Sequence, residues 1–124
     1  MPGYRIDRIS EDIKREIIAI IRELKDPRVN GKMLTVVRVD VSSDATSAKV
    51  YVSALEGIET AKTAVKGLVA ATGYIRRELG QRLRLRKTPE LKFVADDSVE
   101  HGMSIIKKME ELNSDKDGED SNDD

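Results

Sequence analysis

Isoleucine and leucine recur at every third or fourth position between residues 6 and 25, which predicts an amphipathic helix. The apolar stripe consists of Ile6, Ile9, Ile13, Ile17, Ile20, Ile21 and Leu24. Ser10 is a suitable N-terminal cap, and Asp7 would cap an earlier start. Asp26 should end the helix, because the residue before a proline avoids the helical conformation.

Two segments with alternating apolar residues follow, and a short polar turn joins them. In residues 34–42 the apolar positions are Val37, Val39 and Val41, and in residues 46–55 they are Ala48, Val50, Val52 and Ala54. Residues 43–45 have the composition of a turn. The pattern predicts an antiparallel hairpin with helices on one side only.

Helical spacing returns between about residues 59 and 84. The stripe consists of Ala61, Val65, Leu68, Thr72, Ile75, Leu79 and Leu83, and by itself predicts one continuous helix. Gly67, Gly73 and Gly80 interrupt it, and each costs about 1 kcal/mol relative to alanine in a helix. We place a break at Gly73, because its neighbours are small and a tight bend needs room.

The remaining pattern completes an α+β domain. A third strand begins at Leu91, after Pro89, and Ser98 is positioned to cap a last helix. The apolar residues of that helix are Val99, Met103, Ile106, Met109 and Leu112. The predicted order is α-β-β-α-α-β-α, a three-stranded sheet backed by helices in one domain over residues 1–112.

The net charge of −1 conceals a segregation of charge along the chain. Residues 113–124 hold six acids and one lysine, a net of −5, whereas residues 1–112 hold 21 Lys and Arg against 17 Asp and Glu, a net of +4. The last segment has no apolar residue to bury, so we expect a disordered acidic tail. This tail either keeps the protein soluble or covers the basic surface when no partner is bound.

The composition excludes most kinds of catalytic site. There is no cysteine, and His101 is the only histidine, which excludes thiolate chemistry, a His-based triad and a multi-histidine metal site. No Walker-type phosphate loop is present, and no apolar run approaches the length of a membrane span. We therefore expect no catalytic residues, metal or cofactor. A cytoplasmic location fits the absence of cysteine, and we expect the protein to be a monomer. A small carboxylate site using Asp96, Asp97 or Glu100 is the enzymatic alternative.

The strongest functional signal is a basic segment. Residues 74–92 carry seven Lys and Arg and two acids, a net of +5. The candidate RNA-binding residues here are Arg76, Arg77, Arg82, Arg84, Arg86, Lys87 and Lys92. Guanidinium groups suit phosphates because they make planar, two-pronged contacts. The sequence therefore predicts a nucleic acid or another polyanion as partner, and an acidic protein docked on the same face is the alternative.

The first helix carries a second basic stripe. Arg8, Arg15 and Arg22 recur at seven-residue spacing, and we count Arg8 and Arg15 among the candidate RNA-binding residues. A solvated face with intrahelical ion pairs, such as Glu11 with Arg15, explains the stripe equally well.

The scarcity of aromatic residues constrains how RNA is bound. Only Tyr51 is a candidate for an exposed ring on a strand, because Phe93 alternates onto the core face. We therefore expect recognition of the RNA backbone and of folded shape, without reading of base sequence.

Several ordered motifs resemble one known family. They are LKDPR at 24–28, AKVYVS at 48–53, ATGYIRRELG at 71–80, LRLRKTPELKF at 83–93 and DDSVEHGM at 96–103. The order α-β-β-α-α-β is that of type II KH domains, and an Ala-x-Gly junction replaces the usual GxxG loop. With this junction, the chain resembles the ribosome-binding factor A family over about residues 4–105.

The resemblance implies a function as well as a mixed three-stranded sheet. Members of this family are bacterial assembly factors without enzymatic activity. They bind the small (30S) ribosomal subunit near the decoding region and promote late 16S rRNA processing, with a link to cold adaptation. A ribosome-associated GTPase helps to release them. The family's helix kink corresponds to Ala71, Thr72 and Gly73, and its basic flank to Arg76, Arg77, Arg84, Arg86 and Lys87.

Overall fold

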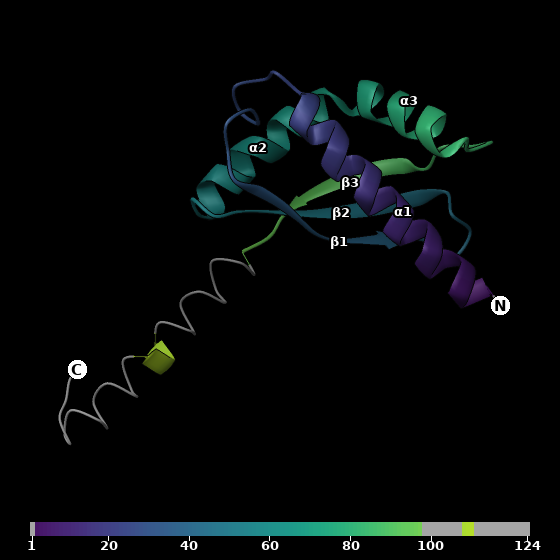
Figure 1. The fold of residues 1–124 in the computed structure, drawn as a ribbon, viewed down its shortest axis with the longest axis horizontal. Helices are drawn as coiled ribbons and strands as arrows, with labels where there is room; N and C mark the ends of the chain where they lie inside the picture. Colours follow the sequence, from purple (N-terminus) through teal and green to yellow (C-terminus); the bar gives the residue numbers. More distant parts are fainter. Residues whose placement is uncertain (1, 98–107, 111–124) are drawn as a thin grey trace.

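The computed structural model describes residues 2–97 and 108–110. Its elements are α1 (Pro2–Glu23), β1 (Leu34–Val41), β2 (Ser47–Ala54), α2 (Ile58–Ala70), α3 (Thr72–Leu83) and β3 (Glu90–Ala95) (Figure 1). The predicted order α-β-β-α-α-β is confirmed. Of the predicted last helix only residues 108–110 are described, and they are helical. The rest of that helix and the acidic tail lie outside the described residues.

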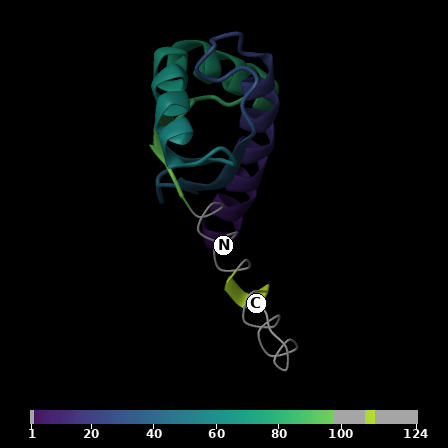
Figure 2. The same ribbon diagram turned by 90° about the vertical axis from the view of Figure 1, so that its left-hand side faces the viewer.

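The three strands form a mixed sheet in the order β1-β2-β3. β1 and β2 pair antiparallel, as the hairpin pattern predicts, and β3 pairs parallel to β2. The parallel pairing requires a crossover, which α2 and α3 provide. The described helices α1, α2 and α3 gather over one side of the sheet, and none of them covers its other face (Figure 2).

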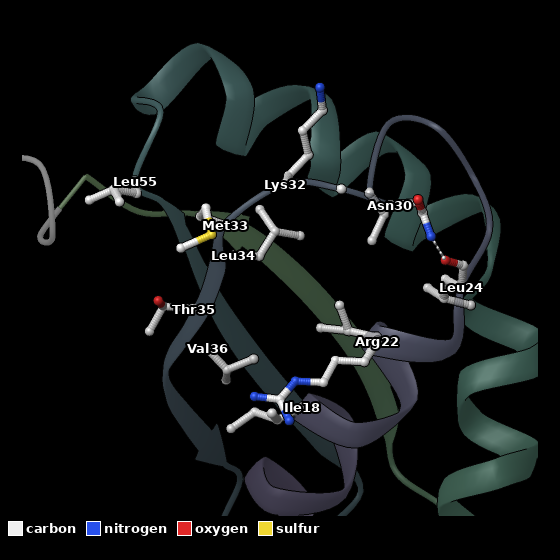
Figure 3. A pocket seen from close by; sticks show the side chains of 13 residues that line it. Ile18, Arg22, Leu24, Asn30, Lys32, Met33, Leu34, Thr35, Val36 and Leu55 are labelled. Atoms are coloured by element: carbon white, nitrogen blue, oxygen red, sulfur yellow. Dashed lines mark hydrogen bonds between the residues drawn. The ribbon is translucent and has the colours of Figure 1, made fainter.

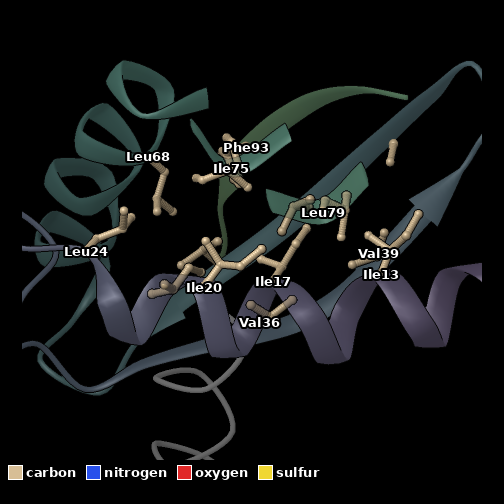
Figure 4. Packing of buried hydrophobic residues seen from close by; sticks show 14 of the residues in the cluster. Ile13, Ile17, Ile20, Leu24, Val36, Val39, Leu68, Ile75, Leu79 and Phe93 are labelled. Atoms are coloured by element: carbon tan, nitrogen blue, oxygen red, sulfur yellow. The ribbon is translucent and has the colours of Figure 1, made fainter. Parts of the chain in front are cut away.

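The core lies between the helices and the covered face of the sheet. Ile13, Ile17 and Ile20 of α1 are fully buried, as are Val50 and Val52 at the centre of the sheet. Leu68 of α2 and Ile75 and Leu79 of α3 belong to the same buried cluster and complete the core (Figure 4). The apolar stripe of α1 is therefore confirmed as its buried face. The helix starts earlier than its Ser10 cap predicts, at Pro2.

A β-bulge changes which valines of β1 face the core. The pairing with β2 shifts between Val36 and Arg38, where one extra residue is inserted. As a result Val36 and Val39 are buried, whereas Val37 is only half-buried. The prediction that Val37 alternates with Val39 onto the core face is wrong, because an unbroken period of two does not allow for the bulge.

The long helical segment breaks at Ala71, two residues before the predicted position. Ala71 has φ −97° and ψ 10°, outside the helical range, and separates α2 from α3. Gly73 lies inside α3, is exposed, and would have open space around an added Cβ. The break therefore falls within the predicted triplet of residues 71–73, but Gly73 does not make the turn.

Another glycine of this segment is required by close packing. A Cβ added at Gly67 would lie 2.8 Å from Val29 Cγ2 and 3.3 Å from Arg28 Cβ. The loop after α1 thus rests directly on the backbone of α2. Gly67 has an ordinary helical conformation, so it is the neighbouring side chains that exclude a larger residue.

The loop after α1 is held by a charged contact. The Asp26 carboxylate accepts hydrogen bonds from the Arg28 backbone N–H at 2.8 Å, from Nε at 3.0 Å and from Nη2 at 2.6 Å. Asn30 Nδ2 also donates to the carbonyl of Leu24 at 3.1 Å. These contacts shape the turn that brings Val29 onto α2.

We expect the Asp26 carboxyl to titrate with a pKa of about 2, against an ordinary value of 3.8, because the Arg28 side chain donates to its charged form. The folded pKa is below the unfolded one. The contact therefore stabilises the fold fully above about pH 4 and is lost as the pH falls toward 2. A carboxyl-detected NMR titration measures this directly, and Arg28→Met should return the midpoint toward 3.8. A wild-type midpoint already near 3.8 would contradict the assignment.

Candidate nucleic-acid interface

Five of the predicted basic residues are exposed, one in the middle of α3 and the others from the end of α3 to the start of β3. They are Arg77, Arg84, Arg86, Lys87 and Lys92. Arg84 adopts a left-handed conformation, with φ 54° and ψ 46°, and ends α3, while the Leu85 N–H donates back to the Gly80 carbonyl at 3.0 Å. This turn reverses the chain, so that the basic loop at residues 84–89 runs from α3 to the edge strand β3.

Arg76, one of the predicted RNA-binding residues, is engaged within the fold. Its Nε donates to the Pro89 carbonyl at 3.0 Å, and its Nη2 donates to the Thr88 carbonyl at 2.8 Å. Arg76 is half-buried and fastens the basic loop to α3. A Cβ added at Gly80 would lie 2.5 Å from Thr88 Oγ1, so the loop also fits closely against the helix backbone.

Arg82 is also engaged within the fold. Its Nη2 donates to Glu23 of α1 at 2.8 Å and to Glu78 at 3.2 Å, and Glu16 lies 4.0 Å from its Nη1. The hydrogen bond with Glu23 raises the pKa of this guanidinium. Three carboxylates around one cation leave no excess of positive charge here. Arg82 joins α3 to α1 and is a poor candidate for binding phosphate.

Tyr74 is a surface residue of this region that the sequence did not single out. Its side chain is 38% exposed, and the Arg77 guanidinium carbon lies 6.0 Å from its ring centroid. Its hydroxyl group donates to Glu23 at 3.4 Å. Desolvation, with help from Glu78 and Glu23, raises the pKa of the phenol. The ring thus supports Arg77 from below, which favours a fixed position for its guanidinium.

The basic stripe of α1 does not join this surface. Arg15 pairs with Asp12 at 3.2 Å and with Glu16 at 3.5 Å, so its charge is largely compensated. Arg8 is exposed and lies eight residues, or about 12 Å along the helix, before Glu16, the nearer of the two α1 residues that contact Arg82. The predicted partner for Arg15 was Glu11, and the structure gives Asp12 and Glu16 instead.

A pocket of about 460 Å³ opens between α1 and the start of β1 (Figure 3). Ile18, Leu24 and Val36 line it, and Arg22 and Lys32 are the charged residues of its lining. Met33 and Leu55, on its rim, are 61% and 51% exposed. The lining contains no carboxylate or imidazole that could act as a general acid or base. Elsewhere in the described part of the chain, no three His, Asp or Glu side chains are grouped as metal ligands would be.

The element order, the mixed sheet and the exposed basic loop define a type II KH-like domain, a class whose members bind nucleic acid. The profile of the ribosome-binding factor A family matches residues 5–109. The chain therefore belongs to the ribosome-binding factor A family.

Individual relatives agree with this assignment. Ribosome-binding factor A of Acetivibrio thermocellus is 47% identical over 92% of this chain and 93% of the relative. The solution structure of a Thermotoga maritima protein described as a ribosome binding factor A has a TM-score of 0.69 and 34% identity, over 79% and 92% of the two chains. The factor of Thermus thermophilus, as a homology model fitted into the cryo-EM map of a 30S complex, has a TM-score of 0.56 and 33% identity, over 67% and 86%.

Proposed function

We propose that this protein is a non-catalytic assembly factor that binds the 30S subunit and promotes late 16S rRNA maturation in the cytoplasm. The observation that carries the proposal is the group of five exposed cations at residues 77, 84, 86, 87 and 92, in a chain of this family. None of the five forms an ion pair with another residue in the described ranges. Their charge is therefore available to phosphates.

We propose that contacts within the fold hold this surface in its binding conformation before RNA arrives. Arg76 holds the loop, Tyr74 supports Arg77, and the left-handed Arg84 fixes the direction of the turn. A surface ordered before binding loses less conformational entropy when RNA arrives. The proposal includes no step of bond-making or bond-breaking, and no catalytic residue, metal or cofactor is part of it. No described helix has the length and apolarity to cross a membrane.

Release from the subunit belongs to the same proposal. A factor held mainly by phosphate contacts dissociates when those contacts are displaced, and a ribosome-associated GTPase is the partner we propose for this step. We propose that the factor acts as a monomer, since a single chain presents the whole basic surface.

Affinity for immature 30S subunits should fall steeply with salt, because each neutralised phosphate releases counterions. Five phosphate contacts give a slope of about −3.5 to −4.5 in a plot of log affinity against log salt. Quantitative cosedimentation between 50 and 300 mM salt, concentrations over which counterion release is about linear in such a plot, measures the slope. A slope near zero would show that the basic surface does not carry the binding. If the partner is RNA, nuclease treatment of the subunits should abolish binding. If the partner is an acidic protein, binding should survive the treatment.

A further inference from the structure

The face of the sheet that the helices leave open carries an unusual row of charges. Asp40 of β1, Lys49 of β2 and Lys92 of β3 are register neighbours, and all three are exposed. Lys49 and Lys92 therefore lie side by side on adjacent strands, about 4.8 Å apart at the backbone. Like charges in this position destabilise a sheet unless something compensates them. Asp40, the acid in this row, is already paired with Arg38 at 3.2 Å. The exposed Glu90 lies on the same face two residues before Lys92, and no ion pair joins it to either lysine among the described residues. The two lysines are therefore not held in an ion pair.

The next row of the same face contains the planar guanidinium group of an arginine. Arg38 and Tyr51 are register partners, and the Arg38 guanidinium carbon lies 4.2 Å from the Tyr51 ring centroid. Asp40 accepts a hydrogen bond from Arg38 Nε at 3.2 Å, so the guanidinium is held from two directions. The side chain is still 59% exposed. Val94, the neighbour of Tyr51 on β3, adds a half-buried apolar surface beside it.

We propose that this open face binds single-stranded RNA, with Lys49 and Lys92 on the phosphates and a base stacked on the outer plane of Arg38. Guanidinium planes and aromatic rings are surfaces on which unpaired bases stack, and such stacking tolerates any base. An acidic peptide would satisfy the lysines, but it offers nothing flat for Arg38. The inference rests on the proposed function, because it adds a second RNA contact to the same protein.

The two proposed RNA contacts, the basic loop at residues 84–89 and the open face of the sheet, meet at the edge of the sheet. Lys92 belongs to both, since it lies on the open face and two residues after the start of β3, where the basic loop ends. β3 is an edge strand, so no further strand among the described residues separates the loop from the open face. A single strand of rRNA bound at residues 84–87 can therefore continue onto Lys92, Lys49 and Arg38.

The test compares matched variants of the full-length protein by fluorescence anisotropy. The probes are a labelled single-stranded 12-nucleotide RNA without internal pairing and a blunt-ended duplex of the same RNA with its complement, in which every base is paired. The sheet variants are Lys49→Gln with Lys92→Gln, and Arg38→Gln alone. The charge-matched control is Lys62→Gln with Lys66→Gln, two exposed positions on α2. Circular dichroism checks that each variant is folded.

We expect the lysine pair to weaken binding of the single strand by about tenfold, while the control pair changes it by less than about twofold. Loss of the stacking plane in Arg38→Gln should weaken binding of the single strand by about 5- to 100-fold and change binding of the duplex little. Equal losses in the sheet and control variants, or equal losses on both RNAs for Arg38→Gln, would overturn the inference. If the sheet variants bind normally while the loop variants Arg77→Gln with Arg84→Gln lose affinity for 30S subunits, the inference fails and the proposed function stands. If wild-type protein binds neither RNA nor subunits, both fail.

Discussion

Replacing Arg77 and Arg84 together with glutamate should weaken binding to immature 30S subunits by about a hundredfold or more, without unfolding the protein. Both side chains are exposed, and neither forms an ion pair with another described residue. Glutamate removes the attraction between arginine and phosphate and adds a repulsion between two negative charges. The left-handed backbone at position 84 is equally strained with either residue, so the turn should persist.

The choice of these two arginines matters because their neighbours have structural roles. Arg76→Glu would repel the Thr88 and Pro89 carbonyls that Arg76 now binds, and would detach the basic loop. Arg82→Glu would place a fourth carboxylate beside Glu16, Glu23 and Glu78. Loss of binding in either variant would report damage to the fold as much as loss of a phosphate contact.

The measurement is cosedimentation with 30S subunits from cells that lack the factor, at fixed salt. Lys62→Glu with Lys66→Glu on α2 is the control with the same change in net charge. Thermal unfolding of both double variants shows whether stability has changed. Normal cosedimentation of Arg77→Glu with Arg84→Glu would move the RNA-binding surface away from the end of α3.

Gly67→Ala should destabilise the protein by about 1–2 kcal/mol, and Gly73→Ala should stabilise it by about 0.5–1 kcal/mol. Both glycines lie in helices, Gly67 inside α2 and Gly73 at the second position of α3, so alanine favours the helical backbone at both positions. The two positions differ in the space available for the new methyl group. The new methyl group at position 67 meets Val29 Cγ2 at 2.8 Å, whereas the one at position 73 meets nothing within 4 Å. Val29 is itself 97% buried by its neighbours, with 3% exposed, so the loop has little room to move away.

Urea denaturation followed by circular dichroism measures both changes against the wild-type protein. The two variants serve as controls for each other, because both replace glycine with alanine. Opposite signs support the close contact between the loop and α2, and a shared stabilisation would show that the loop relaxes freely. Gly73→Ala also tests the kink. If Gly73 were the turning residue, alanine there would destabilise the fold and disturb 30S binding.

Much of the fold could be predicted from the sequence because its signals are local. The isoleucine spacing in residues 6–25 reports the buried face of α1, and alternation in residues 46–55 reports β2. The irregularities of the fold were harder to predict from the sequence. The bulge at Val36 and Arg38 depends on how β1 meets β2, and the break at Ala71 depends on how α2 and α3 pack, so neither follows from residue type alone.

The candidate site shows the same division. Net charge identified residues 74–92 as basic, and the resemblance of the motifs to ribosome-binding factor A indicated the family. Neither could show that Glu23, 59 residues from Arg82 in the chain, compensates that arginine. Nor could a helical wheel show that Arg76 turns toward the backbone of residues 88 and 89. Partners distant in sequence become neighbours only when α1, α3 and the loop are packed together.

The sequence by itself determined the order of the elements, the buried stripe of each helix and the sign of the charge near residues 74–92. These properties depend on residues a few positions apart, whose spacing the backbone geometry fixes. Only the tertiary structure decided which cations remain available. Ion pairs and hydrogen bonds act over a few ångströms in space whatever the separation along the chain. Packing thus assigns Arg76 and Arg82 to the fold and leaves Arg77, Arg84 and Lys92 exposed, which is why we propose these three as phosphate contacts.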